Sequence, residues 1–154
     1  MKLSSEEEMI TLGYRLSEIN LSGQDIVLSL QGDLGAGKTH LTKGIAKGLG
    51  IEDEITSPTF SIVHEFEGET PLLHIDFYRL SADELQSIDL EEIIESWKGW
   101  TVVEWGNLHA HILPQNHIIV DISIEESYRT ITFEVIGTDD YVDQMKKVLM
   151  EITI

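Results

Sequence analysis

The sequence of 154 residues contains no cysteine, only three arginines, and no apolar run long enough to span a membrane. Without cysteine, the chain cannot form disulfides, thiolate metal sites or a thiol nucleophile. Its first eight residues, MKLSSEEE, lack the apolar segment of a secretory signal. We therefore expect a soluble cytoplasmic protein that is not attached to a membrane.

Basic residues are scarce, since 10 lysines and arginines stand against 28 acidic residues, and the formal net charge is −18. A protein that binds along a nucleic-acid backbone needs clustered Lys and Arg, and no stretch of this chain is basic. Extended contact with nucleic acid by this chain alone is therefore not expected. A small phosphate ligand is compatible with the charge, because one helix N-terminus and one lysine can hold it locally.

Short apolar stretches alternate with amphipathic ones along the chain, which predicts strands interleaved with helices. No repeat or linker interrupts this pattern, so we expect a single domain over residues 1–154. The expected strands cover residues 26–30, 60–66, 71–75, 100–105, 117–122 and 129–136. The expected helices cover residues 6–19, 38–49, 81–98 and 107–113, with a last helix that begins near residue 139.

Strands that alternate with helices favour an α/β fold. We expect a P-loop NTPase-like layered sheet, mainly parallel, with an antiparallel C-terminal hairpin and helices on both faces. Ser4 or Ser5 is the candidate cap of the first helix. The core-facing stripe of that helix consists of Met9, Leu12, Leu16 and Ile19.

The stretch GDLGAGKT, residues 32–39, lies between an apolar strand and a helix. The pattern GxxxxGK[ST] curls backbone N–H groups around an anion, and glycine allows the tight curvature. Lys38 is expected to reach the β and γ phosphates of a nucleotide, and the Thr39 hydroxyl to ligate Mg²⁺. The positive end of the helix that begins at Lys38 points at the same place. This is the strongest functional signal in the sequence.

Two carboxylates end apolar strands, Asp76 in PLLHID and Glu104 in WTVVEW. Adjacent parallel strands present their C-terminal ends at one edge of a sheet, so either carboxylate could lie beside Thr39 and its metal. Taken singly, each is equally well explained as an acidic residue where a strand leaves the core.

Two further patterns are weaker. In SPTFS, a proline stiffens a loop that presents Ser57 and Thr59, whose hydroxyls suit a γ-phosphate or its metal. His109 and His111 have a spacing that, on a helix, points the rings apart, and no third metal ligand is evident. We interpret these histidines as surface or packing residues.

In the order GDLGAGKT, SPTFSIV, HIDFYRL and VVEW, these blocks resemble the bacterial TsaE (YjeE) family. Members of this family are small P-loop ATPases that act in forming threonylcarbamoyladenosine (t6A) on tRNA. The resemblance runs from Glu6 to Arg129. It departs from the family pattern at His40, where relatives commonly carry another threonine.

The resemblance implies a set of site residues. Thr39 and Glu104 would hold Mg²⁺, Asp76 would help to organise metal or water, and Thr59 would lie near the γ-phosphate. Glu6 is a candidate contact to the adenine, and Arg129 a candidate contact to the nucleotide. The ATP phosphates would be cradled by Asp33, Leu34, Gly35, Ala36, Gly37, Lys38 and Thr39. Trp105 would pack beside the site.

The resemblance also implies the function: an Mg²⁺-dependent ATPase that serves t6A modification through the TsaD and TsaB proteins, with tRNA reached only through these partners. Turnover by the isolated chain is expected to be slow, because no arginine finger is evident. One alternative is a nucleotide-sensing assembly switch without significant hydrolysis. Another is a small-molecule kinase, which three arginines in all make a poor match. A GTPase is weaker still, because no Asn-Lys-x-Asp motif is present.

Overall fold

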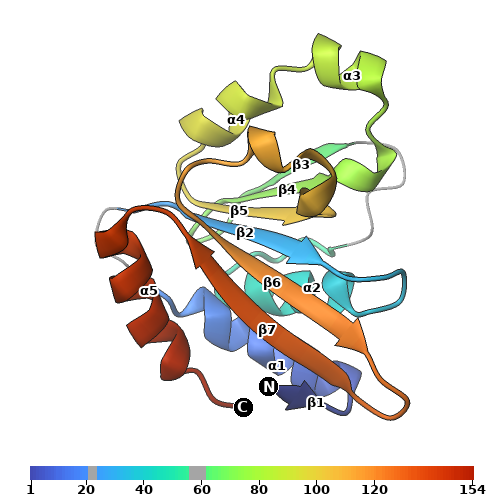
Figure 1. Ribbon diagram of the computed structural model, residues 1–154, viewed down its shortest axis with the longest axis vertical. Helices are drawn as coiled ribbons and strands as arrows, with labels where there is room; N and C mark the ends of the chain where they lie inside the picture. Colours follow the sequence, from blue (N-terminus) through green and yellow to red (C-terminus); the bar gives the residue numbers. More distant parts are fainter. Residues whose placement is uncertain (21–23, 56–61) are drawn as a thin grey trace.

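The computed structural model describes residues 1–20, 24–55 and 62–154. Within these ranges, seven strands form one sheet in the order β1-β7-β6-β2-β5-β4-β3 (Figure 1). The strands are β1 (Lys2–Leu3), β2 (Ile26–Gln31), β3 (Val63–Phe66), β4 (Leu72–Asp76), β5 (Trp100–Glu104), β6 (His117–Ile124) and β7 (Arg129–Ile136).

The four central strands, β6, β2, β5 and β4, are parallel to one another. Antiparallel strands complete both edges of the sheet, with β3 beside β4 on one side and β7 and β1 beyond β6 on the other. The predicted fold class is therefore confirmed, and the antiparallel pairing extends further than the C-terminal hairpin alone.

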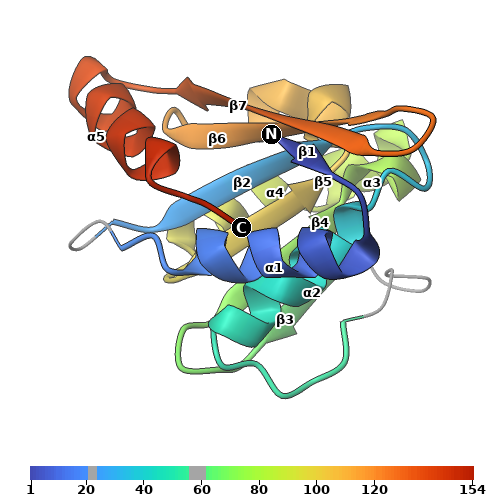
Figure 2. The ribbon, with the colours of Figure 1, turned by 90° about the horizontal axis from the view of Figure 1, so that it is seen from below.

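The described helices lie in layers on the two faces of the sheet. One apolar cluster joins α1 (Glu6–Ser17), α2 (Lys38–Gly48) and α5 (Asp139–Met150) to the sheet, and Figure 2 shows α1 and α2 side by side beneath it. A second cluster joins the other face to α4 (Leu90–Ser96) and to the 3₁₀ segments η1 (Phe77–Arg79) and η2 (Gly106–Ile112). The short helix α3 (Ala82–Ser87) buries none of its residues.

The first helix forms as the sequence predicts. The Ser5 hydroxyl accepts a hydrogen bond from the Glu8 backbone N–H at 3.1 Å, and three glutamates occupy the first turn. The four residues of the predicted stripe are all buried: Met9, Leu12, Leu16 and Ile19. The choice between Ser4 and Ser5 as the cap is thereby settled in favour of Ser5.

Close contact between α1 and α2 depends on two glycines. A Cβ atom at Gly44 would overlap the backbone oxygen of Ile10, and one at Gly13 would overlap that of Leu41. Without side chains at these two positions, the helix backbones approach closely. This contact fixes α2, and with it the loop that precedes α2, against the N-terminal helix.

The predicted helix over residues 81–98 is in fact two helices. Ser81 and Glu84 form a capping box that starts α3, and Asp89 accepts from the Glu92 N–H to start α4. Between them Ile88 is extended, with φ −112° and ψ 121°. Asp89, eight residues after Ser81, is therefore a second N-cap that divides a helical sequence pattern with no visible interruption.

The predicted helix over residues 107–113 is a 3₁₀ segment with a kink, because His109 has φ −138° and ψ 52°. The kink brings the ring centroids of His109 and His111 to 6.2 Å, so the expectation that these rings point apart is wrong. His109 packs edge-on against Phe77. Among the described residues, no three His, Cys, Asp or Glu side chains are placed so that together they could hold a metal ion.

No helix in the described ranges is both long and apolar enough to cross a bilayer.

Tyr141 of α5 has a buried hydroxyl whose effect on stability can be measured. It is 3% exposed, its hydroxyl has no partner within the described part of the chain, and burial raises its pKa from 10.0 to about 12. Below pH 10 the phenol is neutral whether the chain is folded or not. Above pH 10 only the unfolded chain ionises, so stability falls between pH 10 and 12, by about 2–3 kcal/mol for two pKa units.

We predict that Tyr141→Phe removes this alkaline loss and leaves stability at pH 7 equal or slightly higher, since a buried unpaired hydroxyl is lost. The measurement is urea unfolding of both proteins from pH 7 to 11.5. The control is Tyr14→Phe at a 40% exposed tyrosine, which should keep the wild-type pH dependence. An alkaline loss of equal size in wild type and Tyr141→Phe would contradict the prediction.

Candidate functional site

The loop of residues 32–37 joins β2 to α2 and has the curvature that the motif predicts. Gly32, Gly35 and Gly37 have φ values of 144°, 80° and 112°, which side chains of L-residues rarely tolerate. The Ala36 N–H donates to the Asp33 carbonyl at 3.0 Å and closes a turn. Leu34 is 71% exposed at the tip. The glycines therefore form the narrow loop between strand and helix that a phosphate cradle requires.

Lys38 is the first residue of α2 and is only 6% exposed. Its Nζ donates to the backbone oxygens of Gly32 at 2.6 Å and Asp33 at 3.0 Å, and lies 4.3 Å from the centroid of the Trp105 ring. Burial lowers the pKa of Lys38, while Glu104, Asp76 and Asp33 act in the opposite direction. Two backbone carbonyls and the Trp105 ring thus hold the ammonium beside the loop.

The two predicted carboxylates are neighbours. Asp76 and Glu104 are register partners at the ends of the parallel strands β4 and β5, so their side chains leave the sheet on the same face. They are 6% and 5% exposed. Burial raises the pKa of Asp76 and the charge of Glu104 adds to this, whereas the Tyr78 N–H, His74 and Arg79 oppose the rise.

This arrangement fits a divalent cation. Two buried carboxylates close to one loop supply the oxygen ligands that Mg²⁺ prefers, and they repel each other unless positive charge lies nearby. Thr39, in the first turn of α2, is partly exposed and adds a hydroxyl next to Lys38. The donor set is therefore all oxygen, as in the sites where Mg²⁺ bridges a protein and a polyphosphate.

His74 belongs to the same cluster and was not singled out from the sequence. It is completely buried, and its Nε2 lies 2.7 Å from Glu104 Oε2. The available signal was the alternation of PLLHID, which places His74 on the same face of β4 as Asp76. In an apolar strand, a lone histidine is typical of a core residue, so the sequence alone does not distinguish His74 from one.

Trp105 follows Glu104 in a left-handed conformation with φ 60° and ψ 34°, the only non-glycine with positive φ among the described residues. Its N–H donates to the Leu30 carbonyl at 2.9 Å, and its ring packs 4.9 Å from that of Tyr78. A bulky residue in this conformation costs free energy and is typical of functional sites. Here the turn places the indole beside Lys38, as the family resemblance implies.

Glu6 and Arg129 also come together. Both line a cavity of about 170 Å³ between the N-terminal segment and the β6–β7 turn, with Leu3, Ser4, Ser5, Met9, Ser127 and Tyr128. Met9 connects this cavity to the loop, because its methyl group lies 3.0 Å from where a Cβ of Gly37 would be. Glu6 Oε2 also lies 3.5 Å from His40 Nε2. Ser57 and Thr59 lie outside the described residues.

A strand, a glycine-rich loop and a helix that begins with a buried lysine, all facing two carboxylates at adjacent strand ends, define a P-loop α/β protein. Residues 3–148 match the family model described as "Threonylcarbamoyl adenosine biosynthesis protein TsaE". The chain belongs to the TsaE family.

Individual relatives agree with this assignment. A tRNA threonylcarbamoyladenosine biosynthesis protein TsaE from Nostoc is 45% identical over 108 residues, which are 68% of this chain and 65% of the relative. The protein of the same name from Bacillus subtilis is 44% identical over 113 residues, 72% of this chain and 70% of the relative. The aligned part thus spans just under two thirds of the Nostoc protein.

The fold agrees as well. The crystal structure of Bacillus subtilis YdiB superimposes with a TM-score of 0.77 at 31% identity, covering 97% of this chain and 93% of that one.

We predict that Gly37→Ala lowers the free energy of unfolding by about 1–3 kcal/mol, because alanine is strained at φ 112° and its methyl group presses on Met9. The control is Gly35→Ala, which also has positive φ but meets nothing within 4 Å and should cost about 1 kcal/mol. Urea unfolding measures both. Equal losses in the two variants would show that the contact with Met9 adds nothing.

Proposed function

We propose that this protein is an Mg²⁺-dependent ATPase that supports threonylcarbamoyladenosine modification of tRNA through partner proteins. The observation that carries the proposal is the position of Lys38, a buried ammonium at the start of α2 that faces Asp76 and Glu104. A lysine, a helix N-terminus and paired carboxylates are the parts that position and neutralise a transferring phosphoryl group. Membership of the TsaE family supports the biological setting.

Each part has a proposed role. Backbone N–H groups of residues 33–39 would hold the β and γ phosphates, and Lys38 would move from the carbonyls of Gly32 and Asp33 to a γ-phosphate oxygen. Thr39 and Glu104 would ligate Mg²⁺, which supplies charge neutralisation across the phosphates. Asp76 would orient water or a metal-bound water, and the cavity lined by Glu6 and Arg129 would hold the base.

The partners follow from family membership and charge. With a net charge of −18, this chain is a poor surface for tRNA, so the RNA would be held by other proteins. We propose the TsaD and TsaB proteins as these partners. Hydrolysis would then drive a conformational step in the assembly, and a partner would supply a further cation that speeds turnover.

The first test is release of phosphate from ATP and from GTP, by the protein alone and with TsaD and TsaB. Lys38→Ala should lower the rate with ATP by about 100-fold or more, because a charge-assisted contact to the transition state is lost. Lys43→Ala, on the same helix but away from the loop, is the matched control and should keep the wild-type rate. If Lys38→Ala releases phosphate at the wild-type rate, hydrolysis at this loop is ruled out.

A second variant separates the ATPase from an assembly switch. Glu104→Ala should abolish phosphate release and leave nucleotide-dependent association with TsaD and TsaB intact, since the loop that holds the phosphates is unchanged. Association and release are measured on the same samples. If wild type binds ATP and assembles without any release, and Glu104→Ala assembles equally well, the switch is the better description.

A further inference from the structure

His74 is the one fully buried ionisable side chain in the described part of the cluster to which the proposed function gives no role. We propose that His74 is a positioning residue: it holds Oε2 of Glu104 and thereby fixes the carboxylate in the orientation that presents its other oxygen to the phosphate site. This inference rests on the proposed function, because it assigns a task to the supporting side chain of the same site.

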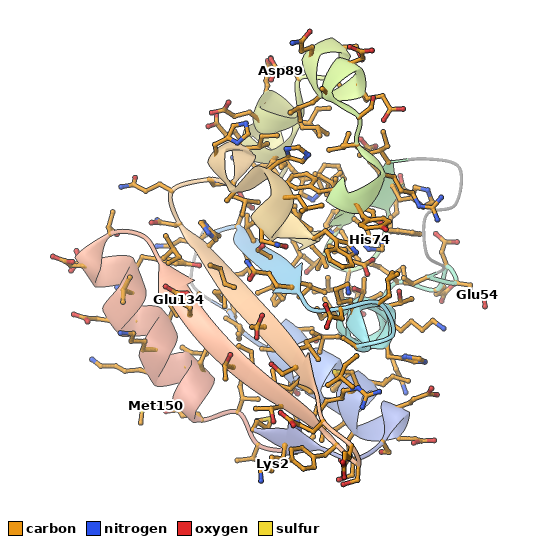
Figure 3. The ribbon with its side chains drawn as sticks, turned by 45° about the vertical axis from the view of Figure 1, so that its right-hand side comes forward. Lys2, Glu54, His74, Asp89, Glu134 and Met150 are labelled. Carbon is orange, nitrogen blue, oxygen red and sulfur yellow. The ribbon has the colours of Figure 1, made fainter. Side chains whose placement is uncertain are left out.

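The strand geometry makes this contact rigid. On β4, His74 and Asp76 point to the same face, and Asp76 lies opposite Glu104 of β5. His74 therefore reaches Glu104 across one strand spacing, with its Nε2 at 2.7 Å from Oε2. Both strands are buried along their whole length and lie inside the sheet. Figure 3 shows His74 in the interior of the molecule. A side chain held on such a scaffold can orient its partner far better than one on a loop.

The hydrogen bond sets the tautomer. The Glu104 carboxylate accepts, so Nε2 of His74 carries the proton and donates. No partner within the described residues reaches Nδ1. In the neutral Nε2–H form, Nδ1 is only an unpaired acceptor, which costs less than an unpaired N–H donor. Among the described residues, Glu104 is thus the one hydrogen-bond partner of the ring.

Packing does not explain a histidine here. The position is completely buried on a strand whose other residues include Leu72, Leu73 and Ile75. Burying an imidazole costs free energy that a leucine in the same place would avoid. Leucine at position 74 would avoid that cost but would leave the buried Glu104 carboxylate without its hydrogen-bond partner, so the histidine is explained by its bond to Glu104. Functional sites commonly contain residues that serve activity at some cost in stability.

The experiment compares His74→Leu, which removes the donor, with His74→Gln, whose amide nitrogen can replace Nε2. His64→Leu is the matched control, because His64 lies opposite His74 on β3 and is only partly buried. Four quantities are measured: kcat and KM for ATP with TsaD and TsaB present, the affinity for Mn²⁺ in the presence of a non-hydrolysable ATP analogue, and the free energy of unfolding in urea.

We expect His74→Leu to lower kcat and the affinity for Mn²⁺ by about 10-fold to 100-fold, the usual effect of losing a side chain that orients a metal ligand. KM for ATP should stay close to wild type, and urea unfolding should show that the variant is still folded in the absence of urea. His74→Gln should recover most of the loss, and His64→Leu should match wild type. Wild-type kcat and Mn²⁺ affinity in His74→Leu would overturn the proposal.

Two readouts do not depend on turnover. If wild type releases no phosphate at all, the proposed hydrolysis fails, and the Mn²⁺ affinities of the variants still decide the role of His74. Long-range ¹H–¹⁵N spectra of the folded wild type should show His74 as the Nε2–H tautomer, whether or not a variant folds poorly. A proton on Nδ1 alone would overturn the proposal, since Nε2 could then not donate to Glu104.

Discussion

The structure of the site depends on one electrostatic constraint: two buried carboxylates, Asp76 and Glu104, end adjacent parallel strands and need positive charge beside them. Lys38 contributes positive charge from the start of α2, to which the glycine loop leads back over the strand ends. His74 and Arg79 also act on Asp76 in this sense. The close contact of α1 and α2 holds this helix in place. A bound metal ion would add positive charge beside the two carboxylates, and the phosphates of a nucleotide would add negative charge beside Lys38. Phosphate oxygens would then replace the carbonyl oxygens of Gly32 and Asp33 as acceptors from Lys38.

Much of this arrangement could be predicted from the sequence. The stripe Met9, Leu12, Leu16 and Ile19 predicts an amphipathic helix, and the loop motif between an apolar strand and a helix predicts the phosphate cradle. The two carboxylates were identified because each ends an apolar run. Their direct pairing in register could not be predicted, since strand order and register depend on contacts between distant segments.

The expectations that differ from the structure share a physical cause. The break at Ile88 accompanies a new N-cap at Asp89, and the kinked His109 packs against Phe77, which is distant in sequence. Neither feature alters the local pattern of apolar residues. His74 could not be predicted as a site residue, because a histidine in a buried strand looks the same in sequence whether it packs or positions a partner. The position of Trp105 beside the site could be expected only from the family resemblance. Its left-handed backbone could not be predicted from the residue type.

The most direct test of the account is a crystal structure with Mg²⁺ and a non-hydrolysable ATP analogue. We expect the β and γ phosphates inside the loop of residues 32–39, Lys38 Nζ moved from the carbonyls of Gly32 and Asp33 to a phosphate oxygen, and the metal bound by Thr39 and Glu104. A nucleotide bound elsewhere, or a metal bound without Glu104 while Lys38 keeps its present hydrogen bonds, would contradict it.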